Sequence, residues 1–181
     1  MEFHITEEQN LFDHVIPQAA SLPRHFTASA VVIAAQHILL VHHKRIGAWL
    51  PPGGHLLDLE LPHQAAVRET LEETGVAVRA LSLSPMPQTA DVDAFFLPQP
   101  LCIQVVRALE KGTDLYHLDI AYLCAPIAPG TLEPSTLPPP RHTDEVHAAR
   151  WFSLSALADT PLAKNVPEII TLAQARTSRL F

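Results

Sequence analysis

The sequence predicts an α/β fold in which a mixed β-sheet carries helices on both faces. Apolar, β-branched runs typical of strands occur before and after a central segment that has a helical pattern of apolar residues. A further helical pattern stands near each end of the chain. This order of helix, strands, helix, strands and helix is the observation that indicates a mixed sheet between helices.

The first half of the chain supplies three predicted elements. A capping-box pattern at Thr6–Gln9 and helical spacing of the apolar residues predict a helix over 7–16, which would cover the core or contact a partner. Strands are predicted over 29–34 and 38–43, joined by a short link. We expect a loop from 44 to 55, because Pro51, Pro52, Gly53 and Gly54 interrupt any regular pattern.

The second half begins with a helix over 62–74. Strands are then expected over 76–83, 101–110, 115–124 and 147–154, a short helical turn over 154–158 and a final helix over 167–176. Between them, 85–100 is predicted to be a loop with an apolar lip at Phe95-Phe96-Leu97, and the proline-rich segment 125–140 a stiff loop.

The composition restricts the kind of protein. With 181 residues, of which 48% are hydrophobic, the chain can form one domain with a hydrophobic core. A net charge of −7 leaves no basic surface for a nucleic-acid backbone, so no nucleic-acid partner is expected. We interpret the 11 histidines as surface and loop composition rather than a metal-binding tract.

The two cysteines and the apolar runs indicate the compartment. Cys102 and Cys124 lie in strand-like segments, where buried free thiols are more plausible than a disulfide or a zinc site. The N-terminus lacks the features of a signal peptide, and no apolar run approaches the length of a membrane span. We therefore expect a cytoplasmic protein with no membrane partner.

The helix over 62–74 carries an unusual charge pattern. Glu69, Glu72 and Glu73 are spaced i, i+3 and i+4, so they share one face. We expect Val67, Leu71 and Thr74 to pack against the sheet from the opposite side. Ala65 and Ala66, one turn before the glutamates, have small side chains and would leave the carboxylate side of the helix uncovered.

Like charges on one face destabilise a helix by a few tenths of a kcal/mol per close pair. Arg68 stands four residues before Glu72 and would neutralise part of the charge, while the rest calls for another cation. Oxygen ligands suit Mg²⁺ or Mn²⁺, and the Gly53-Gly54 turn lets the backbone approach such an ion. The alternative is a solvated acidic helix face bounded by proline and by Gly75.

This segment resembles the Nudix box. The seven fixed positions of the family pattern are matched by Gly54, Glu60, Arg68-Glu69, Glu72-Glu73 and Gly75, followed by the aliphatic Val76. Thr70 departs from the pattern at an aliphatic position, where we expect a tolerated change in packing. Leu61-Pro62 replaces the small polar residue that often caps this helix in the family.

The resemblance implies a Nudix-type α/β/α sandwich and a hydrolase that cleaves a nucleoside diphosphate linked to another moiety, with Mg²⁺ or Mn²⁺ as cofactor. By position, Glu69, Glu72 and Glu73 would bind the metal together with the Gly53 carbonyl. Arg68 would orient the glutamates, and Glu60 would be a supporting carboxylate. The domain would cover 25–181, preceded by an N-terminal helical extension over 1–24.

The resemblance does not assign the catalytic base to one residue, as it does the metal ligands. Many members carry a further acid before the late tryptophan-containing strand, which makes Glu145 the first candidate and Asp144 the second. Both are equally explained as loop-surface charges, and Glu72 or Glu73 are alternative activators of water.

Four residues are candidates for substrate binding, each with a structural alternative. Trp49 would stack on a base or belong to the core. Arg45, with its neighbours in the run His42–Arg45, would contact phosphates or lie at a solvated loop end. His117 and Asp119 alternate along a strand and would face a cleft or be exposed polar residues.

Two other functions remain open at this stage. One is a Nudix-fold nucleotide-binding regulatory module without catalysis, although such modules usually lose glutamates of the box. The other is an enzyme similar to isopentenyl-diphosphate isomerase, for which neither Cys102 nor Cys124 has the expected local motif. Nudix domains often form homodimers, and Phe95-Phe96-Leu97 is a candidate interface.

Overall fold

The computed structural model describes residues 24–85, 93–128, 132–141, 144 and 146–177. The predicted N-terminal helix over 7–16 and the candidate base Glu145 lie outside these ranges. Within them, no helix has both the length and the apolar character needed to cross a membrane.

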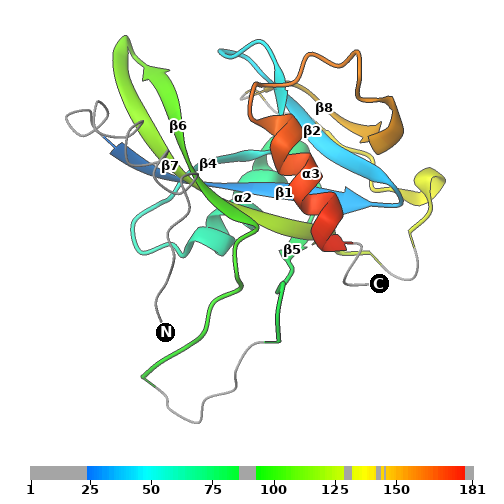
Figure 1. Cartoon of the computed structure of the whole chain (residues 1–181), viewed down its shortest axis with the longest axis horizontal. Coiled ribbons are helices and arrows are strands. Elements are labelled where there is room, and N and C mark those ends of the chain that lie inside the picture. Colours follow the sequence, from blue (N-terminus) through cyan, green and yellow to red (C-terminus); the bar gives the residue numbers. More distant parts are fainter. Residues whose placement is uncertain (1–23, 86–92, 129–131, 142–143, 145, 178–181) are drawn as a thin grey trace, which may run out of the picture.

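Two long strands form the centre of a mixed eight-stranded sheet (Figure 1). β1 (Arg24–Ala34) and β7 (Thr113–Pro126) run parallel to each other from the pair Arg24 and Tyr116 to the pair Val32 and Cys124. The remaining pairs between strands are antiparallel. The chain therefore combines both pairing modes, as the order of predicted elements indicated.

The other six strands attach to this centre. β2 (His37–His43) and β4 (Gly53–His55) both pair with β1. β3 (Trp49–Leu50) and β8 (Val146–Ser153) pair with β2, whereas β5 (Val78–Ala80) and β6 (Cys102–Glu110) pair with β7. Lys111 and Gly112, both with positive φ, form the tight turn between β6 and β7.

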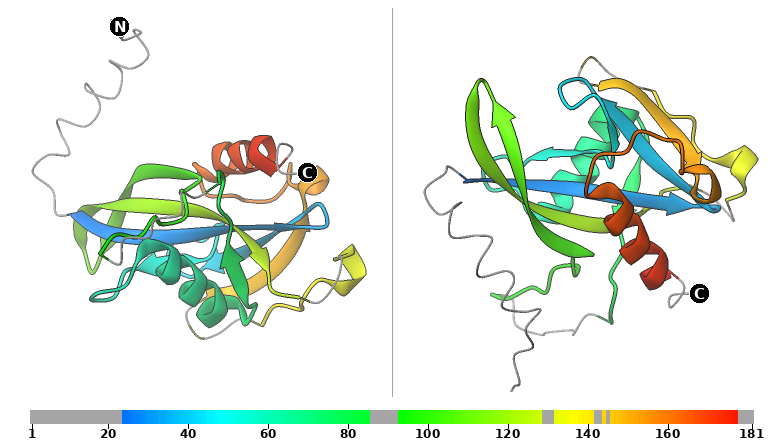
Figure 2. Two further views of the ribbon diagram at one scale, coloured as in Figure 1. Left: turned by 90° about the horizontal axis from the view of Figure 1, so that it is seen from below. Right: turned by 45° about the horizontal axis from the view of Figure 1, so that its top comes forward.

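Two helices cover the sheet from opposite sides, α2 (Pro62–Thr74) and α3 (Val166–Thr177) (Figure 2). Successive side chains along each strand point to opposite faces of the sheet, so a separate hydrophobic core forms between the sheet and each helix. Val31, Leu40 and Leu123 pack with α3, whereas Val32, Leu39 and Tyr122 pack with α2. The α/β/α sandwich is thereby confirmed, with short 3₁₀ helices at η2 (Pro134–Thr136) and η3 (Leu154–Ala156).

The predicted bounds agree best where local signals are strong. The helix over 62–74 is confirmed residue for residue, and the last helix is one residue longer at each end than predicted. The strand expected over 76–83 is shorter, because only Val78–Ala80 pair with β7. The expected loop over 44–55 was wrong in part, since it contains β3 and β4.

Candidate active site

The glutamate helix α2 is built by local sequence signals at both ends. Pro62 occupies its first turn, and the Gln64 side-chain oxygen accepts a hydrogen bond of 3.1 Å from the Leu61 N–H. At the other end Gly75 adopts φ 69° and donates its N–H to Leu71. The missing side-chain cap at Leu61 is thus partly replaced by the glutamine three residues later.

Thr70, the departure from the family pattern, fits its position. It is fully buried, and its hydroxyl donates to the Ala66 carbonyl at 2.7 Å. A buried hydroxyl without a partner would be costly, whereas one bonded within the helix is satisfied. The expected tolerance of this change is consistent with the structure.

The face of α2 that packs on the sheet agrees with the prediction only in part: Thr74 is fully buried and Val67 packs against the core, as expected. Leu71 is 50% exposed, whereas Ala65 and Ala66 are fully buried. Glu69 and Glu73 are also buried, at 9% and 5% exposure. The side predicted to be open is therefore pressed against the sheet, because the alanines are small enough to let the helix approach closely.

Both buried glutamates meet the glycine turn. A Cβ atom added to Gly54 would lie 2.4 Å from a carboxylate oxygen of Glu69, so the glycine leaves room for that carboxylate. The Gly53 N–H donates to Glu73 at 3.0 Å. Gly53 itself is packed against β1, where a Cβ would come within 2.5 Å of the Ala28 carbonyl oxygen.

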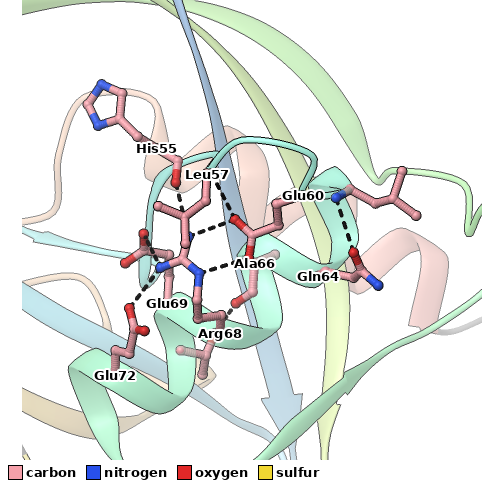
Figure 3. Close-up of polar contacts among 10 residues, drawn as sticks. His55, Leu57, Glu60, Gln64, Ala66, Arg68, Glu69 and Glu72 are labelled. Atoms are coloured by element: carbon pink, nitrogen blue, oxygen red, sulfur yellow. Dashed lines mark hydrogen bonds and ion pairs between the residues drawn. The ribbon is translucent and has the colours of Figure 1, made fainter.

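Arg68 links the carboxylates into one cluster (Figure 3). Its guanidinium donates to Glu60 at 2.8 and 2.9 Å, to Glu69 at 2.8 Å and to Glu72 at 2.7 Å. These bonds, that to Glu60 first, raise the pKa of Arg68 above its already high ordinary value, and the bond from Arg68 lowers the pKa of Glu60. The predicted ion pairing of Arg68 with the glutamates is present, and its role in orienting them stays a prediction.

The glutamate cluster consists of Glu60, Arg68, Glu69, Glu72 and Glu73. When all are ionised, its four carboxylates and one guanidinium leave a net charge of −3 on these five residues. Buried carboxylates require compensating charge. The donors are oxygens only, a set that fits a hard divalent cation such as Mg²⁺ or Mn²⁺.

Arg141, which precedes the two candidate bases in the chain, contacts the C-terminal end of α2. The Arg141 N–H donates to the Thr74 carbonyl at 2.7 Å, and the indole of Trp151 donates to the Pro138 carbonyl at 2.8 Å. Asp144, the second candidate, is exposed. Arg141, three residues before Asp144, thus lies next to the C-terminal end of α2, while Glu145 lies outside the described residues.

Two of the substrate-binding candidates, Trp49 and Arg45, contact residues outside α2. Trp49 is buried at 8% exposure, with Phe152, His42 and the Arg150 guanidinium against its ring, so the core alternative describes it. Arg45 is exposed, 3.8 Å from Glu110. The Cys102 and Cys124 thiols are free, and Cys124 is fully buried.

Asp119 is a buried residue that links neighbouring strands by side-chain hydrogen bonds, rather than an exposed polar residue. It accepts hydrogen bonds from Thr27 at 3.1 Å, Ser29 at 2.8 Å and Gln104 at 3.0 Å. Asn165, at the start of α3, donates in turn to Gln104. Asp119 and His117 do share one face of β7, as predicted, but it is the face covered by α3.

His117 belongs to a cluster that the sequence did not indicate. Together with His25, His55 and Glu110 it forms the histidine cluster, in which one ligand atom from each residue lies within 4.8 Å of the others. These residues come from four strands, so no short sequence motif contains them and their grouping cannot be predicted from local spacing. The interpretation of the histidines as surface composition missed this grouping.

Comparison with known proteins agrees with this geometry. The family model described as "NUDIX domain" matches residues 23–173, and none of the curated proteins compared matches the sequence. Among solved structures, a Nudix-family hydrolase from Clostridium perfringens is similar at 22% identity and a TM-score of 0.61, with 87% of this chain and 99% of that chain covered.

Two further solved structures share the fold. The Nudix domain of NrtR from Shewanella oneidensis, in complex with ADP-ribose, is 19% identical with a TM-score of 0.58, covering 96% of this chain and 99% of that one. An ADP-ribose pyrophosphatase from Streptococcus suis is 19% identical with a TM-score of 0.53, covering 86% and 91%. With the complete box between Gly54 and Val76 and a family match over residues 23–173, this chain belongs to the Nudix hydrolase family.

Proposed function

We propose that this protein is a metal-dependent diphosphatase that hydrolyses a nucleoside diphosphate linked to another moiety. The observation that carries the proposal is the packing of Glu69 and Glu73 against Gly53-Gly54, with Arg68 holding Glu69 and Glu72 in place. A purely structural helix gains nothing from burying two carboxylates beside a third. The cluster is therefore suited to hold a cation.

Glu69, Glu72 and Glu73 would hold Mg²⁺ or Mn²⁺ together with the Gly53 carbonyl. A bound divalent ion would lower the pKa of an attacking water and offset charge on the diphosphate. Arg68 keeps the carboxylates oriented through its fork of donors, a role in which lysine is a poor substitute. Glu72, whose side chain is 49% exposed, is the most accessible ligand for incoming substrate.

We assign Glu145 as the base that takes the proton of the water. What supports the proposal is Arg141, four residues earlier in the chain, whose N–H donates to the Thr74 carbonyl at the end of the helix that carries Glu72 and Glu73. Asp144 is exposed two residues before Val146, which pairs with His43. Glu145→Gln should reduce turnover and spare metal affinity, and unchanged turnover would return the role to Asp144 or a box glutamate.

Cysteine chemistry has little support. Burial raises the pKa of the Cys124 thiol to about 12 and also raises that of Cys102. Neither thiol is activated as a reactive cysteine would be. This argues against the reading as an isomerase similar to isopentenyl-diphosphate isomerase.

The test is a phosphate-release screen with purified protein. The panel begins with ADP-ribose, because the compared structures include an ADP-ribose complex and an ADP-ribose pyrophosphatase. It continues with nucleotide sugars, dinucleotides, nucleoside triphosphates and coenzyme A, each with Mg²⁺, with Mn²⁺ and with chelator. Metal-dependent turnover of one class, lost in Glu73→Gln, is the expected result.

The opposite result is also informative. Nucleotide binding with no turnover on any substrate would contradict the enzyme and support the regulatory module. A sedimentation measurement on the same sample would determine whether the chain forms a homodimer. In the described residues, the exposed segment Phe95-Phe96-Leu97 is our candidate for that interface.

A further inference from the structure

The histidine cluster lies across β4 from the glutamate cluster. Gly54 faces Glu69 of α2, and alternation along the strand directs the next residue, His55, to the opposite face. Figure 3 shows the His55 ring pointing away from Arg68, while the His55 carbonyl accepts a hydrogen bond of 3.0 Å from that guanidinium. The two clusters are therefore adjacent but built from different side chains.

Strand pairing brings the four residues together. His25 stands opposite His117 in the parallel pair of β1 and β7, and His55 stands opposite Thr27 in β4. Glu110 ends β6, next to the turn that leads into β7. Figure 1 places the β6–β7 hairpin beside the start of β1, where these residues converge.

Four distances in the histidine cluster are close to those between the ligands of a four-coordinate metal site. The His25 Nδ1 atom lies 3.2 Å from His55 Nε2 and 3.5 Å from a Glu110 oxygen. The other Glu110 oxygen lies 3.4 Å from His55 Nε2 and 2.9 Å from His117 Nε2. Ligand atoms at about 2.0–2.1 Å from a tetrahedral ion are roughly 3.3 Å apart. The four separations above are close to this value, and one ligand atom from each residue lies within 4.8 Å of the others, so a modest movement of the side chains would bring all four around one ion.

The donor set separates this site from the glutamate cluster. Three imidazoles and one carboxylate suit Zn²⁺ and related transition metals, whereas Mg²⁺ prefers oxygen ligands. The cluster is also accessible, because the His25 and His55 side chains are 43% and 46% exposed. Arg45 is the competing cation, but at 3.8 Å from Glu110 and with 54% exposure it is held weakly.

We propose that His25, His55, His117 and Glu110 bind one transition metal ion of the Zn²⁺ type, separate from the glutamate cluster. The ion would join β1, β4, β6 and β7 at one end of the sheet. Because His55 directly follows Gly53-Gly54, the bound ion would also fix the position of β4, the strand against which Glu69 and Glu73 pack. This inference goes beyond the proposed hydrolysis and does not depend on it.

The experiment uses the full chain without an affinity tag, stripped of metal and dialysed. Co²⁺ is added in the presence of excess Mg²⁺, and the visible absorption of tetrahedral Co²⁺ is recorded, followed by displacement with Zn²⁺. We expect one Co²⁺ per chain. His117→Ala and His25→Ala should each weaken binding by at least about tenfold.

Two matched variants make the test specific. His147→Ala removes an exposed histidine outside the cluster, and Glu73→Gln removes a glutamate of α2, so both should bind Co²⁺ as the unchanged chain does. Glu110→Gln keeps the size of the side chain while removing its charge, which covers the case in which a histidine variant fails to fold. Circular dichroism verifies the fold of each variant.

Two outcomes would overturn the proposal. One is no tetrahedral Co²⁺ signal from the correctly folded chain. The other is uptake that His117→Ala, His25→Ala and Glu110→Gln leave unchanged. Neither outcome bears on the diphosphatase, whose failure would show as absent turnover with Mg²⁺ and Mn²⁺ whether or not Co²⁺ is bound.

Discussion

The glutamate cluster and the histidine cluster lie on opposite faces of β4, yet they arise in opposite ways. The glutamate cluster comes from one window of sequence, with three carboxylates and their arginine on a single helix. The histidine cluster comes from four strands, and its first and last members, His25 and His117, are 92 residues apart in the sequence. The comparison teaches that local spacing reveals the first kind of site, whereas only strand register creates the second.

Glu73→Gln should produce the largest effect on the glutamate side. If Glu73 binds the metal as proposed, its loss removes several kcal/mol of transition-state stabilisation, and turnover should fall by about a thousandfold or more. Glutamine keeps the size of the buried side chain and can still accept from the Gly53 N–H. Steady-state kinetics with Mg²⁺ measure the effect, and turnover like that of the unchanged chain would break the ligand assignment.

Arg68→Lys tests whether geometry or charge matters in the glutamate cluster. Lysine keeps the positive charge but cannot reach Glu60, Glu69 and Glu72 with one planar fork. We expect turnover to fall by about 10- to 100-fold, and half-maximal activity to require a higher Mg²⁺ concentration. A variant with unchanged kinetics would mean that Arg68 contributes charge alone.

A pair of glycine variants separates activity from stability. Gly54→Ala meets the flexible end of Glu69, so that carboxylate must move and turnover should fall by about tenfold at little cost to folding. Gly53→Ala meets the backbone of β1, which cannot move as easily, and should lower the free energy of unfolding by about 1–3 kcal/mol. Kinetics and urea unfolding of both variants check this, and equal effects on stability would contradict it.

Glu60→Gln should change how the free energy of unfolding depends on pH. The bond from Arg68 lowers the pKa of Glu60 below its ordinary value of 4.5 in the folded protein. The ionised carboxylate therefore stabilises the fold at pH values above 4.5, and this contribution is lost as the pH falls through the lowered folded value.

At neutral pH the variant should be less stable by about 1–2 kcal/mol, and the difference should vanish in acid. Urea unfolding at a series of pH values between neutral and acid measures it. A stability difference that stays constant on acidification would show that the Glu60 charge is not the cause.

Arg107→Gln should have the smallest effect. Arg107 pairs with Asp114 across the β6–β7 hairpin, but with 70% of the Arg107 side chain and 36% of the Asp114 side chain exposed, the pair is screened by water. We expect no measurable change in thermal midpoint or in Co²⁺ binding by the nearby histidine cluster. A clear loss of either would mean that the hairpin end depends on this pair, and the contrast between the two clusters would need revision.

The helix α2 shows how far local signals reach. Pro62, Gly75 and the spacing of the glutamates were enough to predict its bounds and its charged face. They were not enough to predict which face is buried, because Leu71 is the more apolar choice in isolation and yet lies exposed. The burial of Glu69 and Glu73 depends on Gly53-Gly54, which approaches only after β4 pairs with β1.

The short strands and the histidine cluster mark the limit of prediction. β3 and β4 have two and three residues, too few for a periodic pattern, and they exist because β2 and β1 offer them backbone partners. The same holds for Asp119, whose alternation with His117 was visible but whose partners Thr27, Ser29 and Gln104 come from neighbouring strands. A register shifted by one residue would place each of these side chains on the other face.

The sequence by itself determined the Nudix box, the glutamate helix and the mixed sheet between helices, because these depend on spacing within short segments. The tertiary structure alone decided that Glu69 and Glu73 are buried against a glycine strand, that Trp49 belongs to the core, and that three histidines meet one glutamate. These contacts join residues distant in the chain, and their positions follow from strand register and from the packing of helices on the two faces of the sheet.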